Sequence, residues 1–246
     1  MNDYHFYYFQ YTTFVHAMAG VIFDPIILYY GGYRYDQPNH LYHMILMVHA
    51  FAYFVYDSII EVYYGTDDLL TNAHHVVVLA ATYFHIMNKF GGYEYILLHL
   101  LAEVSNPFLI FRTVLKIVGM KDSTIYAVND IIFASVFILV RMFLTPLVLI
   151  YMYEGTKVLF AAKIGISFVL YIQLFWCYRI LYLLLEKMKS SYKDPAELPM
   201  WVDVSYNLFK DLSFKKQTKL IVSLVNFMWI FLLPVYYYWD TLLSNY

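Results

Sequence analysis

Charged side chains are scarce in this sequence. Asp, Glu, Lys and Arg make up 14% of the 246 residues, whereas hydrophobic residues make up 62%. A soluble globular domain is typically about 25% charged and about 45–50% apolar. Because so few polar side chains cannot cover the surface of a soluble fold of this length, the composition excludes a soluble globular domain and indicates an integral membrane protein.

Cysteine is rare and basic residues are not in excess, which excludes two further classes of function. The single cysteine, Cys177, excludes an internal disulfide and any cysteine-based metal site. The formal net charge is -2, whereas proteins that bind nucleic acid use a surplus of Lys and Arg to neutralise phosphates. We therefore expect no nucleic-acid partner.

Long hydrophobic runs are abundant instead. A membrane-spanning helix needs about 20 mostly apolar residues. The candidate runs cover residues 7–30, 41–63, 73–90, 93–111, 125–152, 158–186 and 219–239. Glycine pairs and short polar stretches separate them. The sequence therefore predicts an all-α protein, a polytopic membrane helix bundle with about seven transmembrane helices.

Only one polar stretch is long, at residues 188–218, and it separates the last predicted span from the others. Pro195 and Pro199 break helical structure in this stretch, and its charged residues are typical of a solvated surface. We expect one membrane domain without internal repeats. The expected parts are an N-terminal tail at 1–10, the membrane domain at 11–187, a polar loop at 188–218, and an extra C-terminal transmembrane helix with its tail at 219–246.

Histidines and a carboxylate interrupt the second and third predicted spans. His74 and His75 are adjacent, and His85 lies eleven residues after His74, on nearly the same helical face. Asp57 lies inside the second span. Ionisable groups at membrane depth are costly and usually face the interior of a bundle, so these residues predict an internal polar site. The alternative for the histidine pair is solvation by lipid headgroups at the end of the helix.

The fourth predicted span carries a second polar group and a helix breaker. His99 and Glu103 are four residues apart, so they can form a hydrogen bond that serves either helix packing or a chemical site. Pro107 should break or kink the helix and free a backbone carbonyl beside these side chains. Arg112, near the end of the span, is expected to extend to the interface as an anchor. Arg141, in the fifth span, is expected to neutralise carboxylates or bind lipid phosphate.

The other histidines and the metal-binding alternative complete the set of candidates. Histidines next to carboxylates can bind zinc or iron. The repeated spacings of metal-binding histidines are missing, apart from one isolated His-x-x-His, so we predict no metal site. The histidines near the proposed interfaces, expected to have no other role, are His5, His16, His40 and His43.

Five motifs occur in one order along these spans. They are YTTFVHAMA (11–19), AYFVYDSI (52–59), HHVVVL (74–79), LLAEVSNPFLIFRTVLKIVG (100–119) and VNDIIFASVFILVR (128–141). Together they resemble the TLC-domain family, whose multi-pass membrane domain is shared by ceramide synthases and the translocating-chain-associated membrane protein. The similarity covers about residues 11–187, and the chain resembles the small TLC-domain proteins more closely than ceramide synthases.

The resemblance implies roles for particular residues. In ceramide synthases a His-Asp-x-Ser-Asp segment follows the paired histidines one helix later. Alignment on Ser105 places Glu103 at the first aspartate, Asn106 at the second and Ala102 at the histidine. The catalytic residues implied for an enzyme are His74, His75 and Glu103. The residues implied for a lipid-binding pocket are Asp57, His85, His99, Ser105, Asn129 and Arg141.

Three functions fit these features. The first is a TLC-domain protein that binds lipid or influences membrane lipid composition without turnover. The second is a catalytically inactive accessory subunit of a larger membrane complex, respiratory or other. The third is a ceramide-synthase-like acyltransferase that uses the histidine pair for N-acyl transfer.

The expected partners follow from these alternatives. They are membrane lipids and, for an accessory subunit, other membrane-protein subunits. No cofactor is expected, and acyl-CoA would be needed only by an acyltransferase. The expected location is the endoplasmic reticulum or the mitochondrial inner membrane, and the sequence does not distinguish them.

Overall fold

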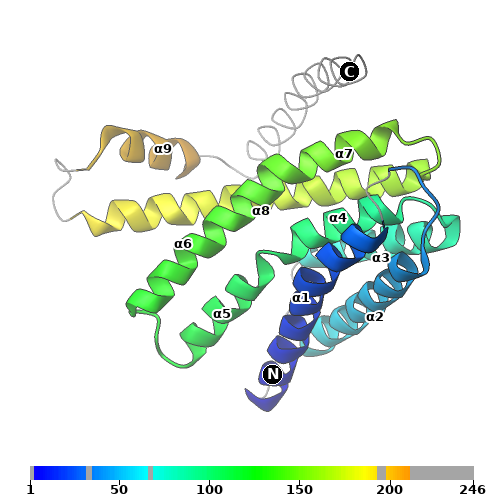
Figure 1. Cartoon of the computed structure of the whole chain (residues 1–246). Helices are drawn as coiled ribbons and strands as arrows, with labels where there is room; N and C mark the ends of the chain where they lie inside the picture. Colours follow the sequence, from blue (N-terminus) through cyan, green and yellow to red (C-terminus); the bar gives the residue numbers. More distant parts are fainter. Residues whose placement is uncertain (1–2, 32–34, 66–68, 193–197, 211–246) are drawn as a thin grey trace. The chain divides into compact units, whose positions relative to one another are not determined.

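The protein is helical throughout the part of the chain that its structure describes. A computed structural model covers residues 3–31, 35–65, 69–192 and 198–210. Apart from an isolated bridge between Pro38 and Phe90, all regular secondary structure in these ranges is helical (Figure 1). The all-α prediction is therefore confirmed.

The helices follow one another through short connections (Figure 1). They are α1 (Asp3–Gly31), α2 (Leu41–Tyr64), α3 (Leu69–Asn88), α4 (Gly92–Glu103), α5 (Asn106–Ile117), α6 (Thr124–Ile138), the π-helical segment η1 (Leu139–Leu144), α7 (Thr145–Glu154), α8 (Phe160–Ser191) and α9 (Met200–Lys210).

Among the described residues, five helical segments are long and apolar enough to cross a membrane. They cover Phe9–Gly31, Leu41–Tyr64, Gly92–Ile117, Thr124–Glu154 and Phe160–Ser191. The chain is thus a polytopic helical membrane protein. The third predicted span corresponds to α3, which has the length of a span but is not among these five segments. The predicted span at 219–239 lies outside the described residues.

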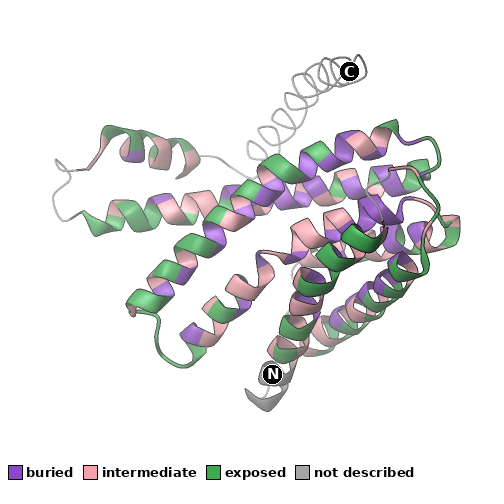
Figure 2. Ribbon diagram, in the orientation of Figure 1, coloured by how far each residue is buried: buried purple, intermediate pink, exposed green. Residues whose placement is uncertain are grey.

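The chain forms two compact units, Met1–Leu170 and Tyr171–Tyr246. In the first unit α1 packs on α4, α2 on α3, and α5 on α6. Buried residues are frequent along α4, whereas many residues on α1 and α2 are exposed (Figure 2). The buried apolar core between α1, α2 and α4 consists of Leu28, Leu46, Met47, Ala50, Tyr93, Tyr95 and Ile96.

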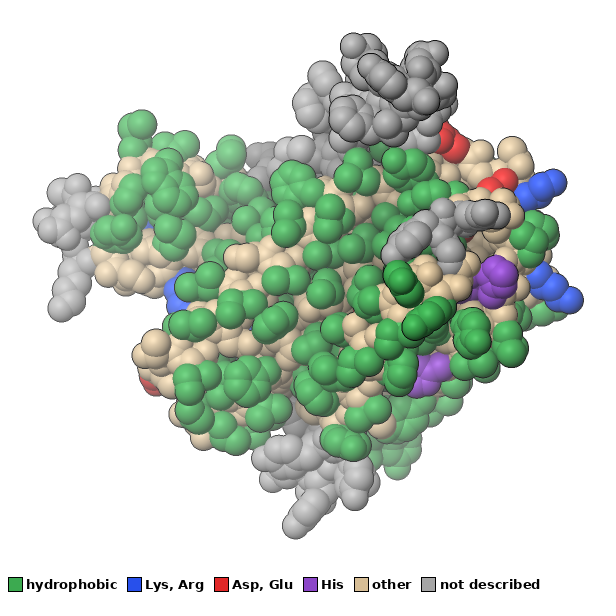
Figure 3. Space-filling view, in the orientation of Figure 1, with side chains coloured by type: hydrophobic (Ala, Val, Ile, Leu, Met, Phe, Trp, Pro, Cys, Tyr) green, Lys and Arg blue, Asp and Glu red, His purple; other side chains and the backbone are tan. Residues whose placement is uncertain are grey.

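The surface of the described helices matches a lipid environment. Large apolar side chains such as Tyr30, Leu41 and Leu69 are exposed. In the view of Figure 3 hydrophobic side chains cover much of the surface, and the Lys and Arg side chains that are visible lie towards its edges. Exposed apolar surface of this extent is expected where acyl chains replace water.

The predicted break in the fourth span lies between α4 and α5. Helix α4 ends at Glu103, Ser105 precedes α5, and Pro107 occupies the first turn of α5. Proline suits that position because it has no N–H to donate and its φ is already helical. The break exposes the Ala102 carbonyl, which accepts a 2.7 Å hydrogen bond from Nη2 of Arg141 on η1.

Three loops meet at one end of the first unit. The Asp36 carboxylate, in the α1–α2 loop, accepts hydrogen bonds from the backbone N–H groups of Thr156 and Lys157 in the α7–α8 loop. Asn39 N–H donates to the Lys89 carbonyl in the α3–α4 loop, at 2.7 Å. The Asn88 amide donates to the Lys157 carbonyl, also at 2.7 Å. The contacts place the ends of α1, α3 and α7 together.

In the second unit α9 packs against the C-terminal part of α8. Nζ of Lys189 lies 2.7 Å from Oδ1 of Asp203 and 4.5 Å from the centre of the Tyr206 ring. The hydrogen bond from Lys189 lowers the pKa of the Asp203 carboxyl. The Tyr178 hydroxyl donates to the Phe209 carbonyl at 2.8 Å. The α8–α9 pair therefore combines polar and aromatic contacts.

Candidate functional site

Two groups of buried titratable side chains lie in the first unit. The α1–α4 cluster contains His16 and Asp24 from α1 and His99 and Glu103 from α4, and the exposed fraction of each residue is 7% or less. The α2–α3 cluster contains Asp57 and Glu61 from α2 and His75 from α3. Their burial at membrane depth makes both clusters candidates for a functional site.

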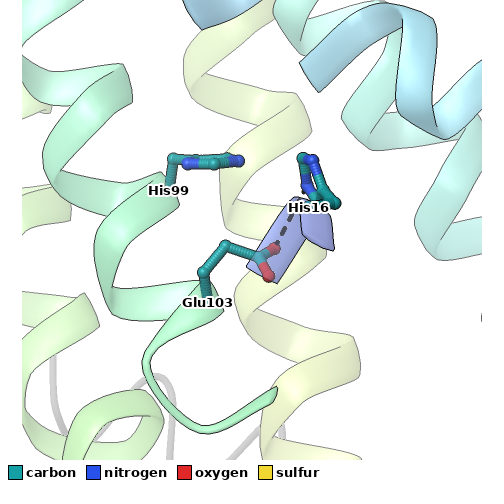
Figure 4. A group of neighbouring side chains, drawn as sticks. All are labelled: His16, His99 and Glu103. Atoms are coloured by element: carbon teal, nitrogen blue, oxygen red, sulfur yellow. Dashed lines mark ion pairs between the residues drawn. The ribbon is translucent and has the colours of Figure 1, made fainter. Parts of the chain in front are cut away.

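In the α1–α4 cluster each carboxylate contacts a histidine of the other helix. Nδ1 of His99 lies 2.7 Å from Oδ2 of Asp24. Nε2 of His16 lies 3.7 Å from Oε1 of Glu103 (Figure 4). The Asn106 amide donates to the second oxygen of Glu103 at 2.9 Å. The arrangement connects α1 to the point where the fourth span is interrupted.

A glycine on α1 brings the two helices of this cluster together. A Cβ atom on Gly20 would lie 2.9 Å from Cγ of Glu103 and 3.1 Å from Cε1 of His99. Such distances are shorter than ordinary van der Waals contacts. The absence of a side chain at Gly20 therefore allows the α1 backbone to lie directly against the functional groups of α4.

Helix α2 contributes the remaining neighbours of His16. The Tyr53 ring stacks on the His16 ring with 3.7 Å between the ring centres. Nε2 of His49 lies 3.3 Å from Nδ1 of His16. Both nitrogens of His16 thus face polar groups, one on α2 and one on α4.

In the α2–α3 cluster one histidine lies between two carboxylates. Nε2 of His75 is 3.3 Å from Asp57, and Nδ1 is 3.3 Å from Glu61. A neutral imidazole has one N–H, so donation to both carboxylates requires a second proton on the ring. His74 is partly buried beside it, with 5.8 Å between the two ring centres. The side chains of this cluster can therefore exchange protons and accept hydrogen bonds from the N–H or O–H groups of a ligand.

The other predicted site residues lie around these clusters. Ser105 is fully buried at the α4–α5 break, beside the Ala102 carbonyl that Arg141 binds. The amide of Asn129 donates to the Phe108 carbonyl at 2.9 Å and so joins α6 to α5. Nδ1 of His85 bonds the Ala81 carbonyl of its own helix at 2.8 Å. Their predicted roles in a lipid pocket stay predictions.

Three expectations about individual residues were wrong. His99 bonds Asp24, at 2.7 Å, rather than Glu103, because α1 supplies a closer carboxylate. His16 is buried and lies in the α1–α4 cluster rather than at an interface. Arg112 pairs with Asp130 of α6, its Nε 2.6 Å from the carboxylate, instead of acting only as an anchor.

Sequence reasoning also missed two carboxylates. Asp24 and Glu61 were not among the predicted site residues, although each completes a cluster. Asp24 lies within an otherwise apolar stretch, and an isolated carboxylate at that depth is itself a signal of function. The partners of both residues could not be assigned without the packing of the helices.

The architecture and these clusters define the class of protein: a polytopic helical membrane protein with titratable groups buried between its helices. The family model of the TLC domain matches residues 6–184. The chain therefore belongs to the TLC-domain family, which is linked to lipid and ceramide biology. No curated protein and no solved structure matches the chain.

Proposed function

We propose that this protein binds a membrane lipid and influences membrane lipid composition without turning the lipid over. The observation that carries the proposal is the α2–α3 cluster, in which His75 contacts Asp57 and Glu61 at 3.3 Å each. Helix packing alone does not require two carboxylates around one imidazole, because burying charged groups is costly. A polar headgroup would provide further hydrogen bonds to these groups.

The chemistry of the cluster suggests which headgroups fit. Ionised carboxylates only accept hydrogen bonds, so they favour ligands that carry N–H or O–H groups. The side chain of Glu61 is 13% exposed and His74 is partly buried, so the cluster reaches the protein surface. The exposed apolar faces of the same helices would contact the acyl chains. A lipid with amine, amide or hydroxyl hydrogens in its headgroup is the ligand we propose.

Lipid analysis of the purified protein tests this proposal. We expect the wild-type protein to retain one headgroup class above its proportion in the membrane, and His75→Gln with Asp57→Asn to lose that enrichment. His43→Gln is a matched control, because His43 is buried but belongs to neither cluster. A lipid profile in the wild type equal to that of the surrounding membrane would contradict the proposal. Membrane subunits that copurify at fixed stoichiometry would favour the accessory role.

The same cluster supports acyl transfer as a second candidate function. An imidazole oriented by a carboxylate can act as a general base or nucleophile, as Asp57 and His75 could here. Ala102 replaces the family's histidine, which weakens this candidate. Incubation with acyl-CoA and a long-chain amine, followed by mass spectrometry, separates the two functions. An amide product that disappears in His75→Gln would establish acyl transfer, and its absence favours lipid binding alone.

A further inference from the structure

The α1–α4 cluster consists of other side chains than the proposed lipid contacts on α2 and α3, and its donor atoms converge. One ligand atom from each of His16, His99 and Glu103 lies within 4.8 Å of the other two. Figure 4 shows the three side chains approaching one another from α1 and α4. All three residues are buried. Each imidazole offers a nitrogen, and the carboxylate offers an oxygen.

Hydrogen bonds fix the orientation of these three side chains, because they hold the ring or carboxylate atoms that point away from the other two residues. The Asp24 carboxylate accepts the Nδ1–H of His99, at 2.7 Å, so Nε2 of the ring points away from Asp24. In the neutral ring Nε2 carries the lone pair that a metal ion would bind. Nε2 of His99 has no hydrogen-bond partner among the described residues. A buried acceptor of this kind is satisfied by an ordered water, a proton or a metal ion.

The two other groups are held in the same way. His49 contacts Nδ1 of His16 at 3.3 Å, which leaves Nε2 of His16 facing Glu103 at 3.7 Å. That separation is longer than a hydrogen bond. The Asn106 amide binds one oxygen of Glu103, at 2.9 Å, and leaves the other towards His16. Metal ligands in proteins are typically oriented by such outer hydrogen bonds.

We propose that His16, His99 and Glu103 bind a divalent transition-metal ion, with zinc the best match. Two imidazoles and one carboxylate form the donor set of many zinc sites that keep a fourth position open. Zinc lies about 2.0–2.2 Å from such ligands, so ligand atoms in a tetrahedral site are roughly 3.3–3.5 Å apart. Small side-chain rotations would bring the three atoms from their present separations to that range. Asp24 is a positioning residue, since its hydrogen bond holds the His99 ring.

The spacing of histidines along the sequence did not reveal this site. His16 lies on α1, 83 residues before His99, and only helix packing brings the two together. The inference does not depend on lipid binding, because it uses a different group of side chains. It does depend on the close approach of α1 and α4 at Gly20.

Metal loading of the purified protein tests the proposal. The full chain, carrying an affinity tag without histidines, is stripped with a chelator in detergent and reloaded with Zn²⁺ or Co²⁺. We expect about one Zn²⁺ per chain and the visible absorption of Co²⁺ in a four-coordinate site. His99→Gln and Glu103→Gln should lose both signals. His43→Gln, which replaces a buried histidine outside the clusters, should keep them.

A variant of the positioning residue Asp24 provides a second measurement. Asp24→Asn keeps all three ligands but weakens the orientation of His99, so the Zn²⁺ dissociation constant should rise by about 10–100-fold at unchanged stoichiometry. Competition with a fluorescent chelator measures it. Wild-type protein that binds neither metal after reloading would overturn the proposal and assign a proton to the cluster. Unchanged Zn²⁺ affinity in His99→Gln would also overturn it. If a variant does not fold, the absorption spectrum of the Co²⁺-loaded wild-type protein decides whether the proposal holds.

Discussion

At the scale of single residues, Asp36 has the clearest dependence on pH. Burial opposes ionisation of this carboxyl, but hydrogen bonds from the backbone of Lys157 and from the backbone and hydroxyl of Thr156 outweigh it and lower its pKa. A lowered pKa in the folded state means that the unfolded chain binds the proton more tightly. The stabilisation is complete above the ordinary pKa of 3.8 and is lost as the pH falls through the folded-state value.

Asp36→Asn tests this loop contact. Asparagine tolerates the left-handed conformation of Asp36, whose φ is 57°, so the backbone is not strained by the change. The change removes the charge and replaces one accepting oxygen with an NH2 donor. Near neutral pH we expect the variant to unfold a few degrees below the wild type. As the pH falls below about 3.8 the difference should shrink, because the carboxyl is then protonated in the unfolded wild-type chain before it is protonated in the folded protein. Thermal unfolding in detergent at several pH values measures it, and a difference independent of pH would contradict the assignment.

Gly20 provides a second prediction at the residue scale. Gly20→Ala places a methyl group 2.9 Å from Glu103 Cγ, and overpacking of this kind typically costs about 1–3 kcal/mol. Gly165→Ala is the matched control: its methyl group would meet Ala81 and Val77 at an ordinary 3.6 Å. We expect a lower unfolding midpoint for the Gly20 variant alone. Equal midpoints for the two variants would show that α1 and α4 do not approach so closely.

At the scale of helical elements, the contact between η1 and the α4–α5 break is the main feature. Arg141→Gln removes the donor to the Ala102 carbonyl, and an unsatisfied buried carbonyl costs about 1–3 kcal/mol. Arg179→Gln, a change of the same kind at an exposed position, is the control. We expect a lower unfolding midpoint only for Arg141→Gln. A similar loss at Arg179 would attribute the effect to charge rather than to the break.

The helices themselves could be predicted from the sequence, whereas their contacts could not. Runs of apolar residues predicted the five segments that qualify as spans, and Pro107 predicted the break in the fourth span, because both are local properties. The burial of His75 also followed from its position within an apolar run. His99 was assigned to Glu103 because the two are neighbours on one helix. The competing carboxylate, Asp24, lies 75 residues away and outweighs that local contact.

At the scale of the whole chain, the contacts between loops indicate whether α3 crosses the membrane. The loops after α1, α3 and α7 contact one another, so the start of α3 belongs to the opposite end of the first unit. The polar residues of α3 lower its hydropathy. Its two ends nevertheless lie at opposite ends of the first unit, so α3 extends as far as its neighbours do. We therefore expect α3 to cross the membrane with them.

Labelling of introduced cysteines tests this arrangement. In a Cys177→Ser background, Lys89→Cys and Lys157→Cys should react with a membrane-impermeant maleimide from one side, because their loops contact each other. Leu69→Cys, at the first residue of α3, should react only from the other side. Lys89, Lys157 and Leu69 are all exposed. Labelling of Leu69→Cys from the same side as Lys89→Cys would show that α3 does not cross.

The six-residue π-helical turn at η1 has a consequence for register. A π turn accommodates one more residue than the α-helix around it. Each residue of an α-helix advances the direction of its side chains by about 100°. Deleting one residue there, such as Met142, would remove the extra residue, let the helix close its ordinary turns and leave the side chains of α7 facing nearly as before. A one-residue deletion in α6 has no extra residue to remove, so it would rotate α7 by about that angle. The side chains of Leu149 and Met152, both fully buried, would then turn away from their neighbours.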